Sequence, residues 1–171
     1  MSASRLALPL TLFLVGCGSD PPGAVAHEAQ ALDFTACLRG DASCITSGEV
    51  HPSEAMFAGE HDLRAYGKDK PATISLPLLR VTGGKKLRWL AFGVRVAGIE
   101  IAKDEQGKPI FGPIGMTVTI DGFAPIVVEP NWGFTRIEVD TRGVEPAPNA
   151  RVTLSVMGQF DFVYSAGRWD E

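Results

Sequence analysis

The sequence predicts a mainly β protein, an antiparallel β-sandwich of six to eight strands. Two observations predict it. After Gly67, short runs rich in Val, Ile, Thr and aromatic residues recur between Gly, Pro, Asn and Asp about every dozen residues. The helices that would connect parallel strands are missing from the pattern. Spacing of this kind is typical of sandwiches, and it leaves jelly-roll and Ig-like topologies both open.

The clearest strand covers residues 151–164. Apolar residues and one glycine alternate along it and are expected on one buried face: Val152, Leu154, Val156, Gly158, Phe160, Phe162 and Tyr164. Thr153, Ser155, Gln159 and Asp161 are expected on the other face. A period of two held over seven positions indicates a strand with one buried side. We expect Gly158 to mark a bend or bulge.

Other strands are predicted at residues 73–82, 86–101, 116–120, 124–129 and 134–140. Asp121-Gly122 is a common tight-turn pair and predicts a hairpin over residues 116–129, because glycine adopts a positive φ at low cost. Residues 140–150 contain a glycine, two prolines and an asparagine and predict a loop. Residues 46–67 show no clear period.

The N-terminus has the pattern of an export signal. Arg5 precedes an apolar run over residues 6–16. This run is shorter than the roughly 20 residues that a transmembrane helix needs, so we interpret it as the apolar region of a signal peptide.

The run ends in Leu14-Val15-Gly16-Cys17, which resembles the lipobox of bacterial lipoproteins. The resemblance implies a diacylglyceryl group on the Cys17 thiol, cleavage just before Cys17 and a membrane anchor made of lipid. Gly18 rather than Asp follows the cysteine, which by the same resemblance favours the outer membrane. The alternative is a secreted protein without lipid, in which Cys17 has no such role.

The predicted organisation therefore has three parts: a signal peptide at residues 1–16, a lipid-anchored tether at 17–35 and a single β-sandwich domain at 36–171. Cleavage before Cys17 would leave 15 basic and 20 acidic residues. This mildly acidic balance argues against a nucleic-acid partner and against a polybasic membrane patch.

Cys37 and Cys44 are the two remaining cysteines, and disulfides persist outside the cytoplasm. We expect them to form a short-loop disulfide, the alternative being two buried free thiols. Arg39-Gly40-Asp41 lies inside this loop and resembles the integrin-recognition tripeptide of adhesion proteins. Three residues recur easily by chance, and Gly-Asp also suits a turn.

No set of residues predicts catalysis, and no cofactor is expected. His51 and His61 lie near several carboxylates, and two imidazoles with a carboxylate suit a transition metal. Their separation of ten residues across Gly and Pro defines no geometry, which favours a solvated loop. A hydrolase or metal-binding protein would require His51, His61 and an acid to converge.

Trp132 lies in Pro130-Asn131-Trp132-Gly133, a turn composition that can expose an indole. An exposed tryptophan can stack on the apolar face of a sugar while Asn131 or Asp121 bonds the hydroxyls, as in many carbohydrate-binding modules. Most tryptophans instead pack into a core, and that is the favoured expectation for Trp132.

The sequence thus predicts a lipid-anchored cell-envelope protein with a non-catalytic binding or structural role. Its expected partners are the membrane, through the anchor, and a glycan or an envelope protein. A carbohydrate-binding module is the first alternative, and an envelope hydrolase or metal-binding protein is the second.

Overall fold

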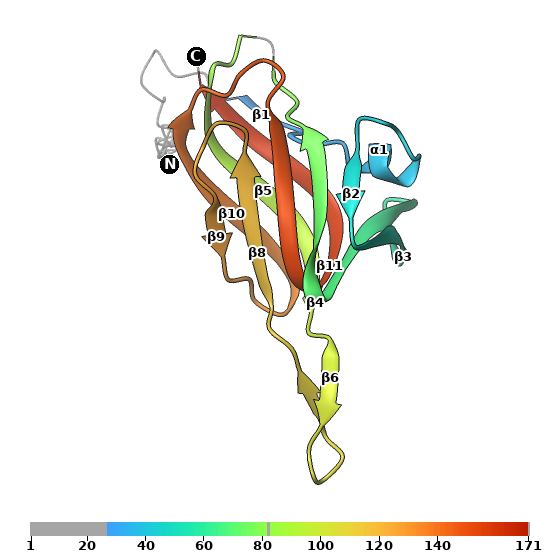
Figure 1. The fold of residues 1–171 in the computed structure, drawn as a ribbon. Helices are drawn as coiled ribbons and strands as arrows, with labels where there is room; N and C mark the ends of the chain where they lie inside the picture. Colours follow the sequence, from blue (N-terminus) through green and yellow to red (C-terminus); the bar gives the residue numbers. More distant parts are fainter. Residues whose placement is uncertain (1–26, 82, 171) are drawn as a thin grey trace, which may run out of the picture.

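A computed structural model describes residues 27–81 and 83–170 and has the mainly β architecture that the sequence predicts (Figure 1). Within these ranges the strand pairings are all antiparallel. The elements are β1 (His27–Ala29), α1 (Phe34–Leu38), β2 (Ile45–Ser47), β3 (Glu49–Phe57), β4 (Glu60–Pro77), β5 (Lys86–Ala97), β6 (Glu100–Lys103), β7 (Pro109–Phe111), β8 (Gly115–Ile120), β9 (Ile126–Val128), β10 (Gly133–Val144) and β11 (Arg151–Asp170).

The described ranges thus contain eleven strands, more than the six to eight expected. The expected strand at 86–101 is divided between β5 and β6, and β11 runs six residues past the predicted end at 164. In the described part of the chain, helices fall short of the length and hydrophobicity needed to cross a membrane.

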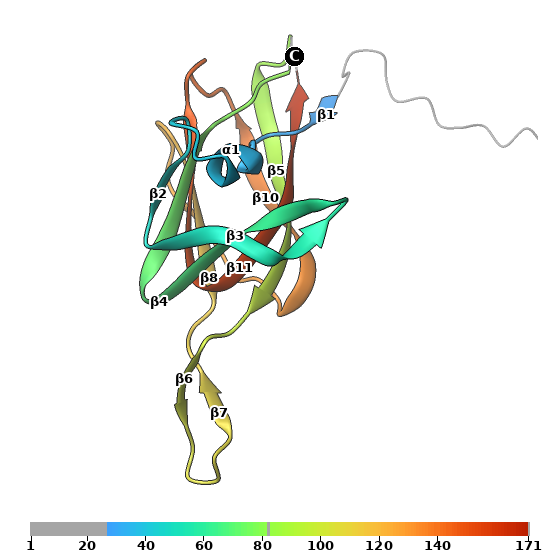
Figure 2. The ribbon, with the colours of Figure 1, turned by 90° about the vertical axis from the view of Figure 1, so that its right-hand side faces the viewer.

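Two long strands, β4 and β11, contribute to both layers of the sandwich. Residues 151–157 of β11 lie between β4 and β8, whereas residues 159–170 lie beside β5. Strands β2, β8 and β9 therefore extend one layer, and β1, β3, β5 and β10 extend the other (Figures 1 and 2). Strands that pass from one sheet to the other in this way form the corners of sandwiches.

The corner lies where the β4–β11 register shifts, between Val156 and Gly158. Gly158 has a φ of +98°, which an L side chain rarely adopts. On the partner strand, a Cβ at Gly67 would lie 2.2 Å from the carbonyl oxygen of Val156. Both strands therefore bend at glycines, one because of its dihedral angle and one because of close backbone approach. The predicted bend at Gly158 is confirmed.

The core lies between the layers and follows the predicted alternation. The buried residues of β11 include Val152, Leu154, Val156, Phe160 and Phe162. They belong to one cluster with residues of β4, β5, β8 and β10, for example Ile74, Phe92, Val118 and Val139. Burial of this apolar surface is the main stabilising contribution.

Tyr164 does not continue the buried face, contrary to the prediction. The register between β11 and β5 shifts between Phe162 and Tyr164, so the alternation changes side there. The Tyr164 ring lies against Gly93, where a Cβ would be 2.1 Å from Cε1. Gly93 stands between the core residues Phe92 and Val94, so it faces the outside of the layer.

The β3–β4 hairpin occupies residues that showed no period in the sequence. Phe57 pairs with Glu60, and Ala58 and Gly59 between them both have positive φ values, 51° and 87°. This is the geometry of a two-residue hairpin turn. Strand β3 is largely exposed on both faces, so its side chains show no alternation of apolar and polar residues.

The folded domain begins before residue 36, where the tether was predicted to end. Strand β1 pairs with β11, and Leu32 and Phe34 are buried in the core. The Ser165 hydroxyl accepts a hydrogen bond from the Leu32 N–H (2.7 Å) and donates one to its carbonyl (2.9 Å). Residues 27–35 are therefore part of the domain. The predicted signal peptide, the lipobox and the rest of the tether lie outside the described residues.

The predicted disulfide joins Cys37 to Cys44. It links the end of α1 to the start of β2. Helix α1 begins after Asp33, whose carboxylate accepts the Thr35 N–H at 3.0 Å. The disulfide favours a location outside the cytoplasm.

The predicted turn at Asp121-Gly122 is also confirmed. The Phe123 N–H donates to the Ile120 carbonyl (2.9 Å), Gly122 has a φ of +85°, and β8 pairs with β9. The predicted loop at 140–150 starts later than expected, because β10 continues to Val144.

Replacing Gly67 by Ala tests the corner. The added Cβ would meet the Val156 carbonyl oxygen at 2.2 Å, and both atoms are fixed by the backbone. We expect the free energy of unfolding, measured by urea denaturation, to fall by more than about 3 kcal/mol. Gly115→Ala is the matched control, because a Cβ there has no atom within 4 Å. Equal stability of the two variants would contradict the proposed role of the corner.

Candidate ligand-binding surface

Trp132 is exposed, contrary to the favoured expectation of core packing. Its exposed fraction is 56%, whereas Trp169 is fully buried in the core and Trp89 is half-buried beneath the Arg136 guanidinium. Trp132 immediately precedes Gly133, the first residue of β10, which pairs with Val96 near the end of β5. From this end of the sandwich the β6–β7 hairpin projects (Figure 2).

Two contacts hold the exposed indole. The Phe111 ring, at the end of β7, packs edge-to-face against it, with centroids 5.1 Å apart and an interplanar angle of 85°. Gly98 lies against the six-membered ring, since a Cβ at this position would be 2.5 Å from Cη2. Edge-to-face pairs of this kind add stability beyond the area that they bury. The ring is therefore oriented, although more than half of its surface is in contact with water.

Polar groups border the two rings. Glu100 pairs directly with Phe111 across the hairpin, so their side chains share a face. The Lys103 Nζ lies 4.0 Å from the Glu100 carboxylate. Asn131 precedes Trp132 and is exposed. We call this set of residues the aromatic platform: Trp132 and Phe111, bordered by Glu100, Lys103 and Asn131.

Asp121 does not belong to the platform. Its carboxylate accepts the Arg151 N–H (3.0 Å), and its own N–H donates to the Arg151 carbonyl (3.0 Å). Arg151 begins β11, whereas Phe160 pairs with Val96 at the platform end. The two positions are separated by nine residues of strand, about 30 Å of chain. The structure thus brings Asn131 and Trp132 together and places Asp121 at the other end of the sandwich.

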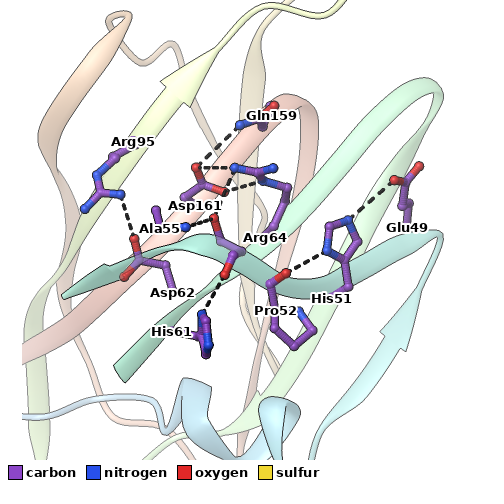
Figure 3. A network of polar contacts seen from close by, with 11 residues as sticks. Glu49, His51, Pro52, Ala55, His61, Asp62, Arg64, Arg95, Gln159 and Asp161 are labelled. Carbon is purple, nitrogen blue, oxygen red and sulfur yellow. Dashed lines mark hydrogen bonds and ion pairs between the residues drawn. The ribbon is translucent and has the colours of Figure 1, made fainter. Parts of the chain in front are cut away.

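His51 and His61 both lie on the β3–β4 hairpin but do not converge (Figure 3). The His51 Nδ1 is 2.9 Å from the carbonyl of Pro52, and its Nε2 is 3.5 Å from Glu49. The His61 Nδ1 is 2.8 Å from the carbonyl of Ser53. Among the described residues, His, Cys, Asp and Glu side chains do not form a group of three or more that could hold a metal ion.

A network of ion pairs covers the outside of the layer near these histidines (Figure 3). Arg64 of β4 donates to both carboxylate oxygens of Asp161 of β11, at 2.6 and 3.0 Å, and also to the Ser53 hydroxyl at 3.0 Å. Asp62 and Arg95 form a second pair at 3.1 Å. Together they connect β3, β4, β5 and β11. Sequence analysis expected Asp161 on the outer face but did not find its partners, which come from distant strands.

Asp62 is the residue of this network whose burial is least well compensated by its partners. It is buried, and its Oδ2 makes no hydrogen bond of good geometry, although the Arg95 guanidinium is close. Burial raises the pKa of the Asp62 carboxyl, and the nearby charge of Arg95 lowers it to a smaller extent. By contrast, the hydrogen bond to Asp161 raises the pKa of Arg64 and so favours its charged form. Because all four charges are occupied by one another, we interpret the network as structural.

No protein-family model and no curated protein sequence matches the chain. Among solved structures, a family two carbohydrate esterase from Cellvibrio japonicus has a TM-score of 0.41 at 12% identity, covering 86% of this chain. The chain spans about a third of the length of that esterase (34%). TmCBM61, solved with beta-1,4-galactotriose, has a TM-score of 0.40 at 14% identity, covering 75% of this chain and 85% of its own.

The tailspike protein 4 of Bacteriophage CBA120 has a TM-score of 0.35 at 9% identity, covering 86% of this chain and 18% of its own. At TM-scores below 0.5, these similarities assign neither a ligand nor an activity to the chain.

Replacing Asp62 by Asn tests the cost of the buried carboxylate. The folded protein binds a proton at Asp62 more tightly than the unfolded chain, so the stability that this group contributes is lost as the pH rises through its folded pKa. We therefore expect Asp62→Asn to be at least as stable as the wild type at pH 7. This advantage should shrink as the pH falls toward the ordinary carboxyl value of 3.8.

The measurement is urea unfolding of both proteins at several pH values between these limits. Asp69→Asn, at an exposed position, controls for charge removal in general. A variant that is less stable than the wild type by the same amount at every pH would contradict the prediction, because a difference that does not change with pH would show that folding does not raise the pKa of Asp62.

Proposed function

We propose that this protein is a non-catalytic glycan-binding domain held at the bacterial cell envelope by a lipid anchor on Cys17. The aromatic platform is the proposed binding surface. One observation supports the proposal above all others: Trp132 is 56% exposed, yet Phe111 and Gly98 fix its ring. A tryptophan gains most stability when buried, so an oriented and exposed indole is best explained by a ligand.

The chemistry of the platform suits a saccharide. A pyranose ring has an apolar face of C–H groups that can stack on an indole, and its hydroxyls need hydrogen-bond partners at the edge. Glu100 supplies an acceptor, Lys103 supplies donors, and Asn131 supplies both. The Trp132 ring is already oriented, which reduces the entropic cost of binding.

Binding rather than catalysis is proposed because of the carboxylates. Most glycoside hydrolases use two carboxylates on either side of the scissile bond. Among the described residues the platform includes one, Glu100, whose carboxylate lies 4.0 Å from the Lys103 ammonium.

The arrangement of the ends is compatible with a membrane anchor. Strand β1 and the end of β11 lie at one end of the sandwich, and the β6–β7 hairpin projects from the other (Figures 1 and 2). Nine residues lie between Cys17 and His27, so the ten residue-to-residue steps could span up to about 35 Å. In this proposal the lipid holds one end at the outer membrane, and the platform points away from it. The Cys37–Cys44 disulfide supports the location outside the cytoplasm.

Trp132→Ala and Gly98→Ala test the platform. The first removes the ring, and the second keeps it but displaces it, because the new Cβ would lie 2.5 Å from Cη2. We expect each to weaken glycan binding about tenfold or more, since 1.4 kcal/mol corresponds to a factor of ten. The measurement is affinity electrophoresis through gels that contain neutral or acidic polysaccharides.

Phe57→Ala is the matched control, because it removes another exposed aromatic ring (52% exposed) from a different hairpin. The proposal fails if the wild type is retarded by none of the polysaccharides, or if both platform variants bind as the wild type does.

Intact-mass spectrometry of the membrane fraction tests the anchor. Wild-type protein should begin at Cys17 and carry added acyl mass, whereas Cys17→Ala should be found without it. Two further thiols should react with an alkylating agent only after reduction, because Cys37 and Cys44 form a disulfide. A wild-type chain that begins elsewhere and carries no acyl mass would exclude the lipid anchor and leave the glycan-binding proposal standing.

A further inference from the structure

A cleft of about 470 Å³ lies between β9 and β10, the outermost strands on one side of the two layers. Strand β9 pairs with β8, and β10 pairs with β5; within the described ranges, neither pairs with a further strand on its other side. The cleft also reaches the β8–β9 turn, so it lies near Asp121 at the end away from the aromatic platform. Its size is that of a small-molecule site.

The floor of the cleft is apolar. Ile120 is buried in the core, and Phe123, Ile126 and Val144 are partly buried and pack against the core. Pro125 and Val127 form part of the same lining. Burying the carbon skeleton of a ligand against such a surface lowers the free energy of the complex.

The rim of the cleft carries Arg142 in a strained backbone conformation. Its φ is +55°, in the left-handed region that costs a residue with a side chain roughly 1–2 kcal/mol. The Asp140 carboxylate accepts the Arg142 N–H at 2.7 Å and helps to hold this conformation. The next residue, Gly143, has a φ of +65°, so the chain uses glycine at one of two adjacent left-handed positions and arginine at the other. Strain of this kind is often kept where the side chain has a function.

The Arg142 guanidinium has no hydrogen bond or ion pair with the described residues. The other polar groups near it are occupied. Asp140 caps the Arg142 backbone, the Thr141 hydroxyl donates to the Leu87 carbonyl, and Arg88, which lies against Gly143, is paired with Asp170. Asp140 and Arg142 are thus the two charged side chains of the cleft lining, neither forms an ion pair with the described residues, and the Arg142 guanidinium is the cationic one.

We propose that this cleft is a second binding site, which takes a small organic carboxylate with an apolar body. The body lies on Ile120, Phe123, Ile126 and Val144, and the carboxylate bonds to the Arg142 guanidinium. Arginine suits this role because its planar fork can donate two parallel hydrogen bonds to a carboxylate. The proposal stands apart from the glycan-binding platform, because the two sites share no residue.

Titration of the purified full-length protein with sodium 4-phenylbutyrate tests the site, followed by NMR of the backbone amides and by calorimetry. We expect shifts for amides of the cleft and binding at least about tenfold tighter than that of 4-phenylbutan-1-ol, which has the same apolar body without the charge. The proposal is overturned if millimolar phenylbutyrate shifts no cleft amide, or if the alcohol binds equally well.

Two variants separate binding from folding. Arg142→Gly and Arg142→Asn both accept a positive φ and lack the guanidinium, so each should lose about tenfold or more in affinity for phenylbutyrate. Arg142→Gly should also unfold at a temperature about 3 °C higher than the wild type, because the strain is relieved. Lys108→Gln, an exposed cation on the β6–β7 hairpin, is the matched control and should bind as the wild type does. Unchanged affinity in the Arg142 variants, or a lower unfolding temperature of Arg142→Gly, would overturn the proposal.

Discussion

The close approach of β4 and β11 at Gly67 and Gly158 is the constraint on which the rest of the structure depends. At this point the backbone of one strand lies where a Cβ of the other would be, and both strands change layer. Because β11 is the central strand of each layer, its bend fixes the angle at which the two sheets face each other. The core residues on either side, such as Val156 and Phe160, can meet only if this angle is kept. The absence of a Cβ at Gly67 therefore determines how a large apolar surface is buried.

The same construction leaves two ends of different character. At the end where β5 finishes, the chain continues into the β6–β7 hairpin, whose Phe111 packs on Trp132. At the other end the short strand β9 and the long strand β10 leave an open cleft between them, with Arg142 at its rim. Both surfaces are formed by residues at the ends of strands, which a rigid sandwich can hold in fixed positions while they remain accessible to ligands.

The parts of the fold that sequence predicted are those with a local pattern. Buried and partly buried residues alternate over residues 152–160 of β11, and the Asp121-Gly122 turn is signalled by two adjacent residues. The β3–β4 hairpin was missed because β3 lacks alternation and the turn is Ala-Gly. Among the candidate site residues, Trp132 and Asn131 are together because they are adjacent, whereas Asp121 is at the far end because the register of β8 on β11 places it there. Phe111, Glu100 and Arg142 were missed because pairings and dihedral angles that depend on the whole fold give them their positions.

Asp62, Trp132 and Arg142 each oppose local stability: Asp62 is buried with an unsatisfied oxygen, Trp132 exposes a large apolar ring, and Arg142 has a left-handed backbone. They differ in whether contacts within the fold explain why the residue occupies its position. Asp62 lies inside a network that connects β4 to β5, so its position has a structural role, and the charge of Arg95 offsets part of the cost of its burial. Neither the exposed face of Trp132 nor the guanidinium of Arg142, which is unpaired within residues 27–81 and 83–170, contributes to the packing described, and smaller or more flexible residues would suit both positions better. Costs that the fold does not require are expected at functional sites, which is why the platform and the cleft, rather than the more conspicuous ion-pair network, are the surfaces assigned to ligands.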